Sequence, residues 1–206
     1  MTMTDMAARG PAIVWRGPVD ADLAVVLDPA GEASHGELPA TWRPLTDKLR
    51  IGWVRLPADG PGLAALTSIL SETKGRRVHI VTAGVATEPV LWVAGTQPRK
   101  VKSLVAIDPQ SCAPDSPWGE WARALEDKGA VVRCFQTAQE DVDLRRPPPA
   151  PLGLPEVVAW VAETIAATEP PSSGLRDTIA RGLRAMRRHR GAGGGRARRT
   201  TGFRTR

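Results

Sequence analysis

The chain has 206 residues and a mass of 22.0 kDa, which allows one domain with an appendage but excludes two full domains. Hydrophobic residues make up 42% and charged residues 24%, which excludes a disordered or fibrous chain. The net charge of +6 is unevenly divided. Residues 171–206 contain eleven arginines against Asp177 alone, a net +10, so residues 1–170, with 17 basic and 21 acidic groups, carry −4. We therefore expect a folded, slightly acidic domain over residues 1–170 and a basic tail over 171–206.

The composition also bears on the compartment. No apolar run approaches the roughly 18 residues that span a bilayer, and the first residues, MTMTDMAARG, lack the basic region and apolar stretch of a signal peptide. We expect a cytoplasmic protein without a transmembrane segment. Cys112 and Cys134 do not have the spacing of metal ligands, and in a reducing compartment we expect them to remain thiols.

The first two predicted elements are short β-branched runs at Ala12–Arg16 and Leu23–Asp28. The two runs are separated by a short link of turn-forming residues, Gly17-Pro18-Val19-Asp20. Such a link is typical of two antiparallel strands joined directly. The sequence therefore predicts an opening β-hairpin.

After the hairpin, strand-like and helix-like segments alternate along the chain. Apolar runs predict strands and 3.6-residue spacing predicts helices, while Arg145–Pro151, with four prolines, predicts an extended connector. The alternation is typical of an α/β fold with a mostly parallel, doubly wound sheet. The expected strands are Ile51–Leu56, Arg77–Thr82, Ser103–Asp108 and Ala130–Phe135, and the expected helices are Leu63–Glu72, Thr87–Gly95, Pro117–Lys128 and Pro155–Thr168.

Several segments of the body resemble the α/β-hydrolase family. RRVHIVTAGVATEPVLWVAGTQPRKVKSLVAIDP is similar to the nucleophile strand, elbow, helix and following strand of that family. TWRPLTDKLRIGWVRLPADGPG resembles the segment after the oxyanion loop, and VVRCFQTAQEDVD resembles the strand and loop that often hold the acid. The resemblance covers roughly residues 23–135 and implies a trimmed α/β-hydrolase-like domain.

The motif that carries catalysis in this family departs from its pattern. The family's elbow, G-x-S-x-G, lifts a serine hydroxyl above the sheet. Here the aligned residues are Thr82-Ala83-Gly84-Val85-Ala86, so Gly84, without a side chain, stands at the nucleophile position. The family's histidine follows the last strand, but the three histidines of this chain, His35, His79 and His189, stand elsewhere. Two of the three catalytic groups are therefore missing.

The remaining catalytic features are also incomplete. Asp108, Asp141 and Asp143 are candidate relics of the acid, although carboxylates in such loops commonly cap helices or stay solvated. The oxyanion loop would be Asp28-Pro29-Ala30-Gly31-Glu32, in which Pro29 lacks an N–H and Glu32 adds negative charge. The sequence has no phosphate-binding or dinucleotide-binding glycine motif and no metal-type cluster. We expect neither a cofactor nor a metal.

These observations favour a non-catalytic, hydrolase-like binding or scaffold protein whose partner is a protein or a small ligand. The alternative is a divergent hydrolase or esterase that acts on a small acyl ester through a rearranged site, such as Thr82 or Thr87 with Asp108. Seven tryptophans could line a ligand pocket, although large aromatic side chains are usually part of a core.

The basic tail suggests a second contact surface. Leu175, Ile179, Leu183 and Met186 recur at helical spacing among arginines, which is typical of a basic amphipathic helix. Such a segment is suited to nonspecific contact with nucleic acid or an anionic membrane surface, or remains a solvated tail. The candidate polyanion-binding residues are Arg184, Arg187, Arg188, Arg190, Arg196, Arg198 and Arg199.

Overall fold

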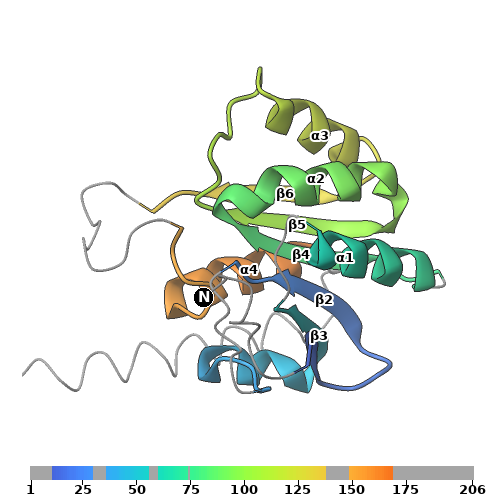
Figure 1. The fold of residues 1–206 in the computed structure, drawn as a ribbon, viewed down its shortest axis with the longest axis vertical. Helices are drawn as coiled ribbons and strands as arrows, with labels where there is room; N and C mark the ends of the chain where they lie inside the picture. The colour runs from blue at the N-terminus through green and yellow to red at the C-terminus, as the bar shows by residue number, and fades with distance from the viewer. Residues whose placement is uncertain (1–10, 30–35, 56–59, 74, 138–148, 169–206) are drawn as a thin grey trace, which may run out of the picture.

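The computed structural model describes residues 11–29, 36–55, 60–73, 75–137 and 149–168. In chain order the elements alternate between strands and helices, as the sequence predicts (Figure 1). The strands are β1 (Ile13–Arg16), β2 (Asp22–Leu27), β3 (Leu49–Val54), β4 (Val78–Ala83), β5 (Val101–Ile107) and β6 (Val131–Phe135). The α-helices are α1 (Pro61–Glu72), α2 (Thr87–Thr96), α3 (Pro117–Glu126) and α4 (Pro155–Ala167), and short 3₁₀ helices occupy η1 (Ala40–Asp47), η2 (Gly84–Ala86) and η3 (Pro98–Lys100).

The six strands form one mixed sheet in the order β1-β3-β2-β4-β5-β6. All neighbouring pairs are parallel except β1 with β3. The predicted α/β class and mostly parallel sheet are thus confirmed, with one antiparallel pair near the N-terminus. The predicted hairpin partner is wrong, because β1 pairs with β3 (Ile13 opposite Val54) and β3 lies between β1 and β2. β2 therefore has a parallel neighbour along each of its two edges, β3 on one and β4 on the other.

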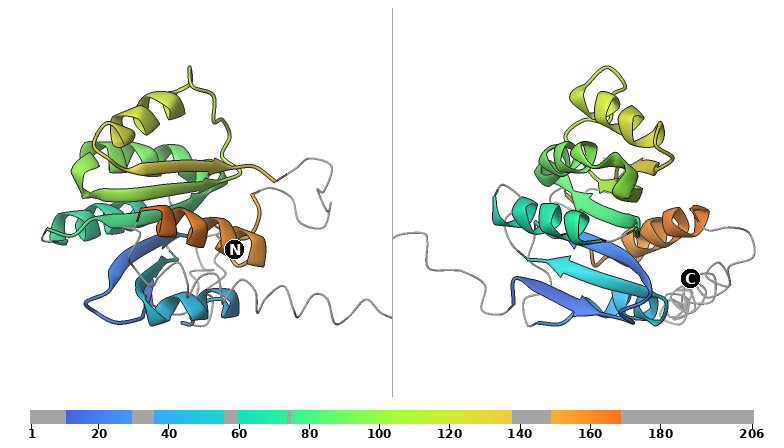
Figure 2. Two further views of the ribbon diagram at one scale, coloured as in Figure 1. Left: turned by 180° about the vertical axis from the view of Figure 1, so that it is seen from behind. Right: turned by 90° about the vertical axis from the view of Figure 1, so that its right-hand side faces the viewer.

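Helices cover both faces of the sheet, and each face has its own hydrophobic core. On one face α1, α2 and α3 pack against side chains such as Ile80 and Leu104. On the other face α4 and η1 pack against Val81 and Val105, the next residues along the same strands. This alternation follows from the two-residue repeat of a strand, and Figure 2 shows α4 on the side of the sheet opposite α1 and α2.

The 3₁₀ helix η1 fills a region for which the sequence predicts no element. It contains Pro44, and it buries Trp42 and Leu45. The indole Nε1 of Trp42 donates to the Leu152 carbonyl at 2.8 Å, and the Trp42 ring meets Trp53 edge to face at 5.1 Å between centroids. These two tryptophans are fully buried core residues, as is usual for large aromatic side chains.

Two cysteines that the sequence predicts to be thiols form a disulfide. Cys112 lies in the loop between β5 and α3, and Cys134 lies on β6. The parallel pairing of β5 with β6 brings the two Cα atoms to 6.5 Å, within the range that a disulfide requires. The expectation of free thiols is wrong for this structure, because a separation of 22 residues along the chain does not reveal that the two positions are neighbours.

Some predictions fall on residues outside the described ranges. They include the boundary at residue 170, the tail with its candidate arginines, His35, His189, Asp141, Asp143 and most of the Arg145–Pro151 connector. Among the described residues, no helix has both the length and the apolar character needed to cross a bilayer.

Candidate functional site

The carboxyl ends of β2 and β4 mark the place where this sheet can form a crevice. From β2 the chain passes to η1 on one face, whereas from β4 it passes to α2 on the other face. Neighbouring parallel strands whose connections leave in opposite directions form the usual ligand site of an open α/β sheet. Asp28 follows β2 and Gly84 follows β4, so both lie at this point.

Gly84 stands at the turn between β4 and α2 that the sequence predicts to be the reactive turn. Its φ of +54° lies in the left-handed region, which glycine adopts without a steric cost. A Cβ atom on Gly84 would lie 2.8 Å from Cγ of Pro149 and 3.1 Å from its Cδ. The ring of Pro149 therefore occupies the space into which a nucleophilic side chain would project.

Asp108 fixes the segment that carries Pro149. It follows β5 with a φ of +45°, which is uncommon for a residue other than glycine. Its Oδ2 accepts a hydrogen bond from the backbone N–H of Ala150 at 2.8 Å, and its Oδ1 accepts one from the backbone N–H of Thr137 at 2.6 Å. The carboxylate thus joins the chain after β6 to the chain before α4, directly beside Gly84.

The alternative site that combines Thr82 or Thr87 with Asp108 is not assembled among the described hydrogen bonds. Both threonine hydroxyls are buried, and neither Oγ1 has a hydrogen-bond partner. The Asp108 oxygens bond instead to Thr137 and Ala150. A carboxylate that is engaged in this way orients no base for these hydroxyls.

Asp28 at the end of β2 is also engaged by the fold. It is 3% exposed, and its Oδ2 accepts a hydrogen bond from Nε1 of Trp53 at 2.9 Å. Within the predicted oxyanion loop, Asp28 and Pro29 are described and residues 30–32 fall outside the described ranges. The described part of that loop therefore places a buried carboxylate at the site.

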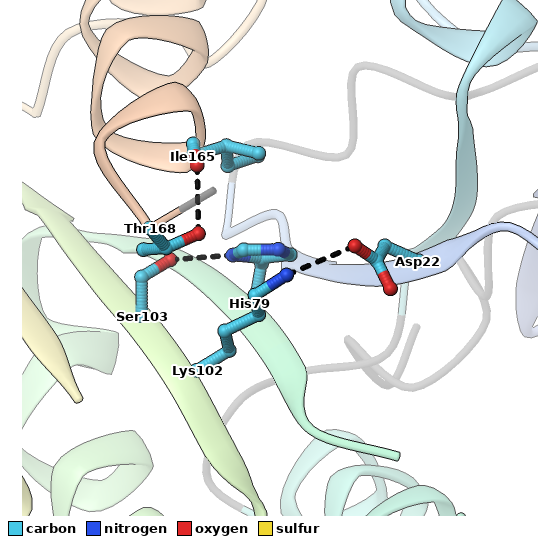
Figure 3. A network of polar contacts seen from close by, with 6 residues as sticks. All are labelled: Asp22, His79, Lys102, Ser103, Ile165 and Thr168. Atoms are coloured by element: carbon cyan, nitrogen blue, oxygen red, sulfur yellow. Dashed lines mark hydrogen bonds and ion pairs between the residues drawn. The ribbon is translucent and has the colours of Figure 1, made fainter. Parts of the chain in front are cut away.

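His79 lies near the opposite, amino end of β4. It is fully buried, and its Nδ1 shares a hydrogen bond with Oγ of Ser103 at 2.8 Å on the neighbouring strand. Figure 3 shows the ring close to Ile165 and Thr168 at the end of α4. Burial and, to a smaller extent, the charge of Lys102 lower the pKa of His79 from 6.5 to about 3. The imidazole is thus neutral at physiological pH and remote from the turn at Gly84.

A small pocket opens beside Gly84, between the start of α2 and the loop after β5. Its volume is about 90 Å³. Thr87 and Leu91 of α2 form one wall, and Ser111 and Trp118 belong to the other. Thr87 is one of the candidate nucleophiles, and Trp118 is one of the seven tryptophans that could line a pocket. The sequence does not predict the pocket itself, because its second wall comes from a loop without a motif.

Metal-binding residues do not cluster in the part of the chain that the structure describes: no group of three or more His, Cys, Asp or Glu side chains is placed to hold an ion. At the carboxyl edge of the sheet, the described residues form a turn at Gly84, which has no side chain. The ring of Pro149 lies over this turn, and a pocket lies next to it.

The strand, sharp turn and helix around Gly84 have the arrangement of a hydrolase elbow on a mostly parallel sheet. The described residues thus form an α/β fold with a mostly parallel sheet.

The chain is similar to several solved structures at low sequence identity. Cfl2 from Burkholderia cenocepacia shares 18% identity over 86% of this chain and 69% of its own, with a TM-score of 0.37. A membrane phospholipase A described as a bacterial virulence factor shares 18% identity over 84% of this chain and 59% of its own, with a TM-score of 0.39. A loop variant of a haloalkane dehalogenase from Bradyrhizobium elkanii shares 14% identity over 87% and 72%, with a TM-score of 0.36. No protein-family model and no curated protein matches the chain.

Proposed function

We propose that this protein is a non-catalytic binding module built on an α/β-hydrolase-like scaffold. The observation that carries the proposal is the turn at Gly84, where the nucleophile position has no side chain and the ring of Pro149 fills the space above it. Acyl transfer needs a nucleophile, a base and a group that orients the base, and the loss of one of them typically costs several powers of ten in rate.

Two polar groups of the described residues support the same reading. Asp108 is saturated by loop hydrogen bonds, and His79 is paired with Ser103 at the other end of β4. Neither group is bonded to the hydroxyl of Thr82 or Thr87 in the described contacts. Within the described residues, the scaffold is therefore hydrolase-like and no triad is assembled.

An activity assay on the full chain tests this proposal. We expect no turnover of p-nitrophenyl butyrate above the rate of buffer and no labelling by a fluorophosphonate. Turnover or labelling that disappears in Thr82→Val or Thr87→Val, but persists in the matched control Thr67→Val on α1, would establish the rearranged esterase instead. Thr67 is a suitable control because it is exposed and its hydroxyl bonds within its own helix, to the Leu63 carbonyl.

We also propose that the tail binds polyanions. The charge of +10 over residues 171–206, against −4 over the rest of the chain, supports this second contact. Cationic residues that neutralise phosphates release counterions, so such binding weakens steeply as salt rises.

The test uses the full chain and a variant in which the seven candidate arginines are replaced by glutamine. They are Arg184, Arg187, Arg188, Arg190, Arg196, Arg198 and Arg199. We expect the variant to lose most of its affinity for duplex DNA and for anionic vesicles, together with most of the salt dependence, as measured by fluorescence anisotropy and co-sedimentation. Equal binding by the two proteins would refute a role for the tail.

A further inference from the structure

One of the residues that line the pocket beside Gly84 carries an unsatisfied polar atom. Thr87 is 2% exposed and lines the pocket, and its Oγ1 has no hydrogen-bond partner. A buried hydroxyl without a partner is costly to the folded state, and a hydroxyl can both donate and accept a hydrogen bond. The Thr87 hydroxyl is therefore suited to form a hydrogen bond with one polar atom of a molecule that enters the pocket.

The walls around this hydroxyl are largely apolar. Leu91 is fully buried one turn further along α2, and Trp118, near the start of α3, adds an aromatic surface from the opposite side. A ligand that contacts both walls gains from the removal of apolar surface from water. The pocket therefore favours a ligand whose body is apolar.

The charges around the pocket select against ions. None of the described residues that line it is Lys, Arg or His, and the exposed carboxylate of Glu88 lies at the rim. The carboxylate of Glu88 repels an anion but attracts a cation, whereas the positive end of α2, which begins at Thr87, has the reverse effect. Neither sign of charge therefore gains a net attraction that offsets the loss of hydration on burial, and an uncharged ligand avoids that loss.

The size of the pocket limits the ligand further. A volume of about 90 Å³ is smaller than the roughly 150 Å³ cavity that accommodates benzene. Because Val85 and Glu88 are both exposed and belong to the lining, the pocket reaches the surface. A group of a few heavy atoms fits inside, and a longer ligand can extend outward past these two residues.

From these observations we infer that this pocket binds a small uncharged molecule, or the uncharged end of a longer one, which has an apolar body and one polar atom that hydrogen-bonds to Thr87. Short amides and alcohols belong to this class. The inference rests on the proposed binding function and specifies the ligand chemistry of the site that lies next to the closed turn.

Three small probes of similar length test the inference on the full chain: propionamide, propionate and propylammonium. We expect propionamide to shift the backbone amide resonances of residues 84–91 and 110–118 at millimolar concentrations, and the two ions to bind at least tenfold more weakly. Shifts that are scattered over the surface, or equal binding of all three probes, would overturn the inference.

Two variants identify the group responsible. Thr87→Val keeps the shape of the side chain but removes the hydroxyl, so we expect at least a tenfold loss of propionamide affinity, with an unchanged or higher melting temperature. Thr67→Val is the matched control and should bind as the wild type does. Equal affinity in Thr87→Val and the wild type would refute the role of Thr87. An active esterase would overturn the proposed function through a separate readout, whatever the outcome of these titrations.

Discussion

The two ends of β4 differ in the residue types that they carry and in the surroundings of those residues. At the amino end, His79 and Ser103 form a hydrogen-bonded pair of the kind that hydrolases use, but both side chains are fully buried. At the carboxyl end, where an α/β sheet offers a crevice, the turn carries only Gly84 under the ring of Pro149. The reactive residue types of β4 and β5 thus lie at the opposite end of the sheet from the crevice. A histidine and a serine within bonding distance do not make a catalytic site unless a substrate can reach them.

The two ends are also held together in different ways. The carboxyl end depends on links between loops, namely the disulfide of Cys112 with Cys134 and the carboxylate of Asp108. The amino end depends on buried polar groups within the sheet, with the Lys102–Asp22 ion pair beside His79. Each difference can be tested by a change at one end alone.

Loss of the disulfide should have the largest effect. A cross-link between residues 22 positions apart lowers the conformational entropy of the unfolded chain. This raises the free energy of unfolding by about 3 kcal/mol. We expect the variant with both Cys112→Ser and Cys134→Ser to lose about that much free energy of unfolding in urea titrations under non-reducing conditions. Dithiothreitol should destabilise the wild type by a similar amount and leave the variant unchanged. Identical urea midpoints for wild type and variant would show that the covalent link does not support the carboxyl end.

Acid should lower the free energy of unfolding through His79, which lies near the amino end of β4. Burial lowers the pKa of His79 from its ordinary value of 6.5 to about 3 in the folded protein, so between these values the unfolded chain binds more protons. The contribution to stability is complete above pH 6.5 and is lost as the pH falls towards 3. Between pH 7 and pH 5 we expect a loss of about 2 kcal/mol.

The control for this pH dependence is His79→Asn, which does not titrate. Urea unfolding of wild type and variant at both pH values gives the difference between their losses, and this difference isolates the histidine from the carboxylates. A variant that loses as much stability as the wild type between pH 7 and pH 5 would show that the acid sensitivity arises elsewhere.

Filling the turn at Gly84 should reveal the contact with Pro149. In Gly84→Ser the new Cβ would meet the Pro149 ring at 2.8 Å, whereas in the background of Pro149→Ala the two nearest ring atoms are absent. A double-mutant cycle on these two changes should give a coupling energy of about 1.5 kcal/mol. Additive effects would mean that the proline does not occupy the nucleophile position in solution.

A subtler change tests the carboxylate that anchors this proline. Asp108→Asn tolerates the positive φ about as well as aspartate does, but its amide nitrogen cannot accept a hydrogen bond. We expect a loss of about 1 kcal/mol in urea unfolding. Faster amide hydrogen exchange at Thr137 and Ala150, with unchanged exchange in β4, would localise the effect to the loops. Unchanged exchange at both amides would contradict the proposed role of Asp108.

Much of the fold could be predicted from local signals. Proline at the first turn and apolar residues at helical spacing define α1 and α4, and Gly129, with a φ of +78°, follows the end of α3 as expected. The turn at Gly84 could be predicted as well, because a strand, a small-residue turn and a helix follow one another directly.

The rest depends on contacts between distant segments. The pairing of β1 with β3 rather than with β2 depends on tertiary contacts, and the short link between β1 and β2 does not reveal them. The proline over Gly84 is 65 positions further along the chain, and the second wall of the pocket comes from the loop after β5. Residue types identified the missing nucleophile, whereas only the fold shows what occupies its place.

The insertion of β3 between β1 and β2 also has a consequence for the order of assembly. β1 has a single partner strand, and its contacts, from Ile13 with Val54 to Arg16 with Ile51, close a long loop. Long-range pairing of this kind forms slowly. During synthesis β1 leaves the ribosome before β3 and must therefore wait for it, and we expect β1 to join the edge of a sheet that β2, β3 and β4 have already begun to build.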